Sequence, residues 1–184
     1  MISLLAALAL NFGLVVDSNM TRAEALADNK FPSKSLDRLD LVDVRYFSFD
    51  GKVHQGQLVV DRALSREVRE LFAAIERRRF PISKAVPIVR YGWNDRVSMK
   101  DNNSSGFNYR LIQGSKRLSK HALGRAIDLN PLLNPCLKKP ILGTYNPSVP
   151  GTLTKSSPIV RLFERRGWHW GGHWRVKDYQ HFEK

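Results

Sequence analysis

The feature that most constrains this chain is a set of four metal-binding or acid–base side chains in two short segments. His121 and Asp128 lie seven positions apart in one segment, and Asp178 and His181 lie three apart near the end of the sequence. A catalytic zinc site needs three protein ligands, one open position and a nearby carboxylate that is not a ligand. His121, Asp128 and His181 can be the ligands and Asp178 the general base, so the fold must bring the two segments together.

Two further histidines suggest an alternative ligand pair. His169 and His173 are four positions apart, which on a helix would place both on one face. Gly171 and Gly172 lie between them, and glycine disfavours a helix. We therefore expect His169 and His173 to be rim or packing residues rather than ligands.

Taken together, the two segments resemble the signature of the D-alanyl-D-alanine metallopeptidase family, which includes VanY-like carboxypeptidases and the L-alanyl-D-glutamate endopeptidases of phage lysins. The residues that carry the resemblance are, in order, Ser119, His121, Gly124, Ala126, Asp128, Asp178 and His181. The stretches 103–110, 128–135 and 167–174 are also similar to that family. The resemblance extends from about residue 40 to the C-terminus.

This resemblance implies a zinc metallopeptidase in which His121, Asp128 and His181 hold Zn²⁺ and Asp178 is the general base. It also implies a functional Arg110, which would stabilise the oxyanion or hold a substrate carboxylate; a surface salt bridge is the alternative. The residues expected to contact the substrate are Ser119, Arg96 and Trp170.

The implied substrates are the stem peptides of bacterial peptidoglycan. The resemblance leaves D-alanyl-D-alanine carboxypeptidase and L-alanyl-D-glutamate endopeptidase open, although aspartate as the base leans towards the endopeptidases. Zn²⁺ is the usual metal for two histidines and one aspartate, with Mn²⁺ or Fe²⁺ as alternatives. A non-catalytic, metal-containing module that binds the cell wall is a rival, and it would need a fourth protein ligand. A metal-dependent nuclease is a second rival, and it would need a basic cluster around the metal.

The order and periodicity of the predicted elements indicate an α+β fold, with a small antiparallel sheet and helices packed to one side. The resemblance implies that the zinc lies in a surface cleft of this fold. Segments 41–49 and 53–60 are expected to form a hairpin around Asp50–Gly51. Helices are expected from Ser65 to Arg79 and from Ser157 to Gly167. The predicted strand 86–91 is followed by a polar loop, 92–106.

The N-terminal residues suggest export. Met1–Val16 is almost entirely apolar, and Ala25–Ala27 offers a small-residue cleavage site, so we expect 1–27 to be a secretory leader. An uncleaved anchor or a misassigned start codon are the alternatives, because no basic residue precedes the apolar run. Residues 28–40 are expected to be a linker and 41–184 the catalytic domain, secreted, periplasmic or associated with the cell wall.

Charge and cysteine content limit the remaining choices. Thirty Lys and Arg residues against seventeen Asp and Glu give a formal net charge of +13, which attracts polyanions. No common nucleic-acid-binding motif is present, so we expect anionic cell-wall polymers rather than nucleic acid as partners, and a monomer. Cys136 is the one cysteine, which excludes a disulfide within the chain. We expect it to be an inert thiol in a proline-rich loop.

Overall fold

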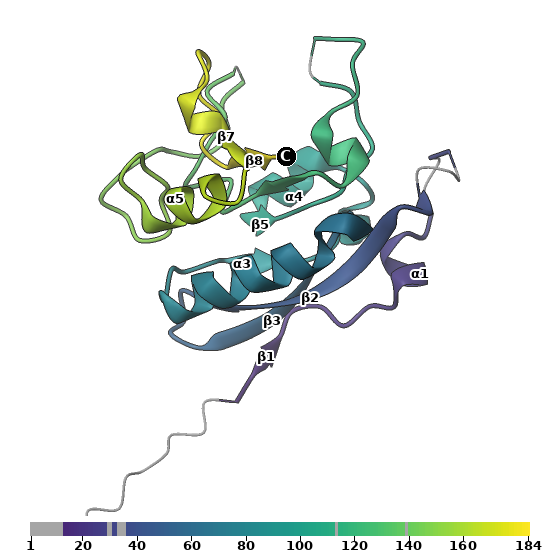
Figure 1. Cartoon of the computed structure of the whole chain (residues 1–184), viewed down its shortest axis with the longest axis horizontal. Coiled ribbons are helices and arrows are strands. Elements are labelled where there is room, and N and C mark those ends of the chain that lie inside the picture. The colour runs from purple at the N-terminus through teal and green to yellow at the C-terminus, as the bar shows by residue number, and fades with distance from the viewer. Residues whose placement is uncertain (1–12, 29–30, 33–35, 113, 139) are drawn as a thin grey trace, which may run out of the picture.

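A computed structural model describes residues 13–28, 31–32, 36–112, 114–138 and 140–184. These residues form the expected mixed α+β fold, built from small sheets and short helices (Figure 1). The α-helices in the described part of the chain are α1 (Arg22–Ala25), α3 (Ser65–Arg77), α4 (Asp95–Lys100) and α5 (Pro158–Glu164).

The first sheet has the strand order β1–β3–β2. β2 (Leu39–Phe47) and β3 (Val53–Asp61) are antiparallel and form the predicted hairpin. Gly51 in the connecting turn has a φ of 81°, a conformation that glycine adopts without strain. β1 (Val15–Val16) runs parallel to β3 and so extends this sheet from the N-terminal side.

Two smaller sheets complete the fold. β4 (Lys84–Ala85) and β5 (Asn103–Ser104) form a parallel pair. β6 (Ala126–Asp128), β8 (His181–Glu183) and β7 (His169–Trp170) form an antiparallel sheet in that order. The prediction of one small antiparallel sheet is thus corrected: three sheets are present and two contain a parallel pair, because strands far apart in sequence pair with each other.

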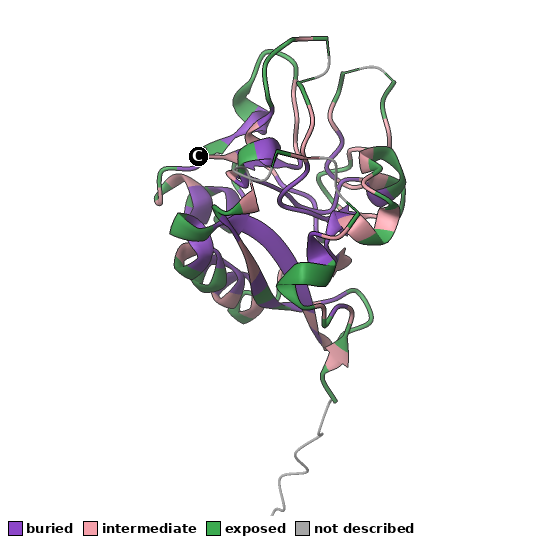
Figure 2. Ribbon diagram, turned by 90° about the vertical axis from the view of Figure 1, so that its right-hand side faces the viewer, coloured by how far each residue is buried: buried purple, intermediate pink, exposed green. Residues whose placement is uncertain are grey.

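The main core lies between the hairpin and α3. The helix packs against β2 with the face that its apolar periodicity predicts, formed by Val68, Leu71, Phe72 and Ile75, all of them buried. In Figure 2 a strand coloured as buried runs beside the long helix. The same core continues through Ile127, Phe163, Trp168, Trp170 and Phe182, so the strands of the third sheet rest on it.

Two segments differ from the sequence-based expectation. The predicted strand 86–91 is instead a 3-10 turn over Ile88–Tyr91, which follows the short strand β4. The predicted polar loop 92–106 contains α4, whose first turn is capped by Asn94: its side-chain oxygen accepts a hydrogen bond from the Val97 N–H. Asparagine is a favoured N-cap residue, and this was the signal available in the sequence.

The residues before the hairpin pack onto it. The Tyr46 hydroxyl donates a hydrogen bond to Asp17, and His54 Nδ1 lies 2.9 Å from the same carboxylate. Ala25 and Leu26 are buried, and the Ala27 carbonyl accepts a hydrogen bond from the Trp93 indole. A cleavage after Ala27 would therefore remove β1 and α1 from the domain. Among the described residues, no helix has the length and apolar character needed to cross a membrane.

Candidate metal centre

The pairing of β6 with β8 brings Asp128 and His181 together. The register of the two antiparallel strands places Asp128 opposite His181 and Ile127 opposite Phe182. Ile127 and Phe182 are fully buried in the core. Because successive side chains of a strand point to opposite faces, Asp128 and His181 share the face that points away from that core.

His121 reaches the same point from a 3-10 turn, Lys120–Leu123. Ser119 caps this turn, since its hydroxyl accepts a hydrogen bond from the His121 N–H at 3.3 Å. Gly124 ends the turn with a φ of 67°, and a Cβ at this position would lie 2.4 Å from the backbone nitrogen of Asp61 in β3. Glycine is required for so close an approach, which presses the motif against the hairpin.

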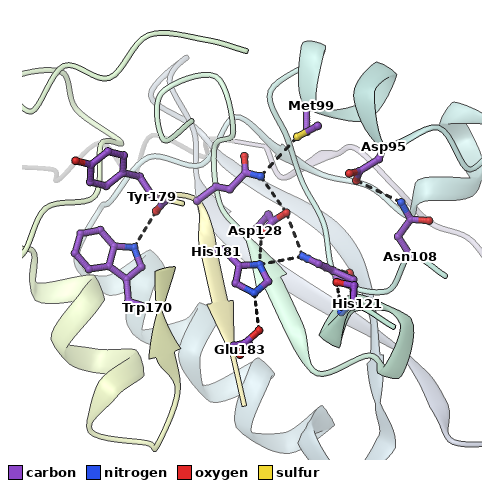
Figure 3. A network of polar contacts seen from close by, with 12 residues as sticks. Asp95, Met99, Asn108, His121, Asp128, Trp170, Tyr179, His181 and Glu183 are labelled. Atoms are coloured by element: carbon purple, nitrogen blue, oxygen red, sulfur yellow. Dashed lines mark hydrogen bonds and ion pairs between the residues drawn. The ribbon is translucent and has the colours of Figure 1, made fainter. Parts of the chain in front are cut away.

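Three potential ligand atoms converge at this point (Figure 3). His121 Nε2 lies 3.1 Å from His181 Nδ1 and 3.2 Å from Asp128 Oδ2, and His181 Nδ1 lies 3.0 Å from Asp128 Oδ1. The ligand atoms of a tetrahedral zinc ion, with bonds of about 2.0–2.2 Å, are about 3.3–3.6 Å apart. Small adjustments would therefore let the three side chains hold such an ion.

The second nitrogen of each imidazole decides where the lone pairs point. His121 Nδ1 lies 2.5 Å from the carbonyl oxygen of Gly106. A carbonyl oxygen can only accept a hydrogen bond, so Nδ1 carries a proton and is the donor. His181 Nε2 lies 3.1 Å from Glu183 Oε2 and donates to that carboxylate. When both histidines are neutral, two lone pairs and the Asp128 carboxylate point at one spot, which is an arrangement that a cation stabilises.

The electrostatics of the group lead to the same conclusion. Burial alone would raise the pKa of Asp128, but His121 and His181 hold that pKa well below its usual range. Burial alone would lower the pKa of His181, but hydrogen bonds to Asp128 and Glu183 raise it to about 10. Without a metal ion a proton therefore bridges the buried pair, and the same ligands suit Zn²⁺ once that proton leaves.

A supporting layer that was not predicted from the sequence surrounds the three side chains. The Gln180 amide donates to Asp128 Oδ2 at 3.3 Å and also contacts the Met99 sulfur on α4 at 3.6 Å. Glu183 orients His181 from the same strand. The signal for Glu183 was available, since residues two apart in a strand share a face. The roles of Gln180 and Gly106 depend on tertiary contacts and had no local signal.

Asp178, the predicted base, lies in a turn directly before β8. The His181 N–H donates to the Asp178 carbonyl at 3.3 Å, which closes this turn. The Asp178 carboxyl group is not one of the three converging groups. Burial and the charge of Asp128 raise its pKa to about 6, and its Oδ1 atom is buried without a hydrogen-bond partner among the described residues.

Cys136 lies beside Asp178. The two residues form an isolated antiparallel bridge. Burial and the charge of Asp178 raise the pKa of the Cys136 thiol to about 11, so it stays protonated and can donate. The sequence indicated an unreactive loop thiol, which agrees with this high pKa, but it contained no sign of the contact with Asp178.

Arg110 is joined to the site through its backbone and through α4. Its carbonyl accepts a hydrogen bond from the Ser119 N–H at 3.0 Å, two residues before His121. Its Nε atom lies 3.2 Å from Asp95 Oδ2 at the start of α4. The salt bridge considered as an alternative is therefore present, and it holds a side chain that remains about one-third exposed, at 32%. Arg96, also expected to contact the substrate, is exposed on α4.

Two of the residues predicted to contact the substrate, Ser119 and Trp170, are buried. Ser119 is buried and caps the turn of His121, which is a structural role. Trp170 is in the core, 2% exposed, because its indole packs inward and donates to the Tyr179 carbonyl at 2.8 Å. Trp174 is instead the tryptophan at the surface, and its ring centroid lies 5.2 Å from that of His181.

His169 and His173 do not join the metal-binding group. The group found among the described residues consists of His121, Asp128 and His181. His173 is exposed and lies 2.8 Å from Glu164 on α5, and His169 is exposed on β7. Both positions agree with the expectation that neither histidine is a ligand of this group.

Comparison with known proteins relates the C-terminal part of the chain to a known family. Residues 113–184 match the model of a family described as D-alanyl-D-alanine carboxypeptidase, and this region contains the three converging residues and Asp178. No curated protein and no solved structure matches the chain.

Proposed function

The match of residues 113–184 supports membership of the D-alanyl-D-alanine metallopeptidase family, and from this premise we propose that the chain is a zinc-dependent peptidase acting on peptidoglycan stem peptides. The observation that carries the proposal is the convergence of His121 Nε2, His181 Nδ1 and the Asp128 carboxylate. Two imidazoles and one carboxylate are a common ligand set for catalytic zinc.

The number of ligands favours an enzyme over a structural metal site. A closed structural zinc site has four protein ligands, whereas catalytic zinc keeps one position for water or substrate. Three groups converge in the described part of the chain, and His173, a possible fourth, is paired with Glu164 instead. The alternative of a non-catalytic, metal-containing module that binds the cell wall therefore receives less support than the peptidase.

Each residue of the proposed site has a separate role in amide hydrolysis. A zinc ion bound here would polarise the substrate carbonyl and lower the pKa of the attacking water. Asp178 takes the proton from that water and delivers it to the leaving amine, a role that suits a buried carboxylate with a pKa of about 6. Arg110, steadied by Asp95, stabilises the developing oxyanion or holds a substrate carboxylate.

The proposal is tested by incubating the purified protein with muropeptides, with and without a chelator, and measuring the products by mass spectrometry. Chelator-sensitive loss of one terminal D-alanine would identify a carboxypeptidase. Chelator-sensitive cleavage of the bond between L-alanine and D-glutamate would identify an endopeptidase. Inactivity on all stem peptides by a protein that binds zinc would favour the binding module.

We further propose that the protein acts outside the cytoplasm, because the apolar run Met1–Val16 is typical of an export signal. The positive net charge of +13 suits work near an anionic cell wall. N-terminal sequencing of the exported protein would show whether the leader is cleaved after Ala27, or whether residues 15–27 remain in the domain.

A further inference from the structure

Three loop segments carry most of the large apolar side chains that are exposed in the described part of the chain. We call the exposed residues of 111–112, 114–118, 137–138, 140–141 and 174–177 the loop surface. Of the twelve large apolar side chains that are exposed in the described residues, seven belong to it: Leu111, Ile112, Leu118, Leu137, Ile141, Trp174 and Val176. Concentrated exposed apolar side chains mark an interaction site, whereas scattered ones need no explanation.

The three segments lie at the same end of the molecule and contact one another at two points. Figure 1 shows 111–118 in teal, and the green and yellow segments 137–141 and 174–177, projecting from the same end of the molecule. In Figure 2 this end is largely coloured as exposed. The Leu137 N–H donates to the Lys177 carbonyl at 2.7 Å, and Lys138 Nζ lies 3.7 Å from the position of a Cβ on Gly114.

The loop surface carries positive charge only. Segments 111–118, 137–141 and 174–177 contain no Asp or Glu, and their exposed basic residues in the described part of the chain are Lys116, Arg117, Lys138 and Arg175. Their sequences alternate aliphatic and basic residues, as in Lys116–Arg117–Leu118 and Trp174–Arg175–Val176–Lys177. A tryptophan is also present, a residue that is enriched at the boundary between water and lipid.

We propose that the loop surface binds an anionic lipid membrane. Its aliphatic side chains and Trp174 would enter the headgroup region, and its basic residues would contact lipid phosphates. Nucleic acid or an anionic wall polymer would engage the charge but would leave Leu111, Ile112 and Val176 in water. A second copy of the same surface is disfavoured because the two faces would repel each other. The inference does not depend on the metal site, although His121 and Asp178 lie next to these loops in sequence.

The test uses the full-length chain and cosedimentation with vesicles of phosphatidylcholine alone or mixed with phosphatidylglycerol. We expect binding that requires phosphatidylglycerol and that falls about tenfold or more in two double variants. One is Ile112→Ser with Leu118→Ser, and the other is Lys116→Glu with Arg117→Glu. The control is Phe49→Ser with Arg66→Glu, which changes exposed residues of the same kinds outside the loop surface and should bind like wild type.

Since Met1–Val16 is present in every variant, the differences between variants decide the result. Vesicles should also shift the tryptophan emission to shorter wavelength, and Trp174→Phe should reduce the shift. Three outcomes would overturn the proposal. The first two are equal vesicle binding by all variants and loss of binding in the charge variant alone. The third is an apolar variant that changes only self-association or the KM for a soluble stem peptide. Circular dichroism and zinc content of each variant exclude misfolding as the cause.

Discussion

At the scale of single residues, the main question is which carboxylate binds metal and which one moves a proton. Asp128 lies opposite His181 across two paired strands, whereas Asp178 lies outside the converging group. We expect Asp178→Asn to keep about one zinc per chain and to lose hydrolysis by about 10²- to 10⁴-fold. Asp128→Asn should lose both hydrolysis and zinc, because it removes the charged ligand. Metal analysis and single-substrate assays on both variants measure this, and loss of zinc from Asp178→Asn would make Asp178 a ligand.

The pKa of Asp178 leads to a prediction about pH. Burial and the charge of Asp128 raise this pKa to about 6, and the base works only as the carboxylate. We therefore expect kcat/KM to fall about tenfold per pH unit as the pH drops below the pKa of Asp178. A bound cation lowers this pKa, so the fall should begin at or below about pH 6. The residual activity of Asp178→Asn should lack this limb. An unchanged limb in that variant would assign the ionisation to another group, with Glu183 as the next candidate.

Glu183 is expected to act through His181. It accepts a hydrogen bond from the imidazole nitrogen that faces away from the site, which orients the ring and raises its basicity. Glu183→Gln should weaken zinc affinity by about 10- to 100-fold, with less effect on kcat once zinc is saturating. Glu164→Gln is the matched control, because Glu164 pairs with the exposed His173. Equal zinc affinities of the two variants, measured by competition with a chelating dye, would remove Glu183 from the supporting layer.

At the scale of elements, local signals predicted the parts that local physics determines. The hairpin followed from Asp50–Gly51 between two apolar runs, and α3 from the spacing of Val68, Leu71 and Ile75. The parallel pairs β1–β3 and β4–β5 could not be predicted, because they join short segments that have no periodicity of their own. Likewise, the sequence motifs indicated which residues form the candidate site, but the β6–β8 register that aligns them is a tertiary property.

Gly124 connects an element boundary to the site. Its φ of 67° and the backbone of Asp61 beside it leave no room for a Cβ, whereas Gly51 has a φ of 81° with nothing within 4 Å. We expect Gly124→Ala to lower the free energy of unfolding by about 2 kcal/mol or more, and Gly51→Ala by about 1 kcal/mol. Urea unfolding of both variants measures this difference. Equal decreases in the free energy of unfolding would mean that the turn after His121 can accommodate a Cβ at residue 124 without additional strain.

At the scale of the whole molecule, the candidate site joins segments that lie far apart in the sequence. β6 and the 3-10 turn of His121 come from the middle of the chain, and β8 forms its end. Any ligand that binds the folded state and not the unfolded state stabilises the protein by mass action. A zinc ion held by His121, Asp128 and His181 should therefore raise the melting temperature of the entire domain.

The size of this effect should depend on pH in a defined direction. In the zinc-free protein the pKa of His181 is about 10, above the unfolded value of about 6.5. The stabilisation that its proton provides is fully present below about pH 6.5 and is lost as the pH rises through about 10. Zinc replaces this proton, so the zinc-loaded protein does not lose stability in the same way, and the zinc affinity itself increases with pH.

We therefore expect zinc at about 1,000 times its dissociation constant to contribute about 4 kcal/mol, or roughly 8–16 °C in melting temperature. At one fixed zinc concentration, the difference between zinc-loaded and chelator-treated protein should be larger at pH 8 than at pH 6. His121→Ala should abolish it at both pH values, while Glu164→Gln should keep it. Calorimetric melting curves give the measurement. A zinc effect that survives in His121→Ala would place the ion elsewhere, and an effect that shrinks as the pH rises would contradict competition between zinc and the His181 proton.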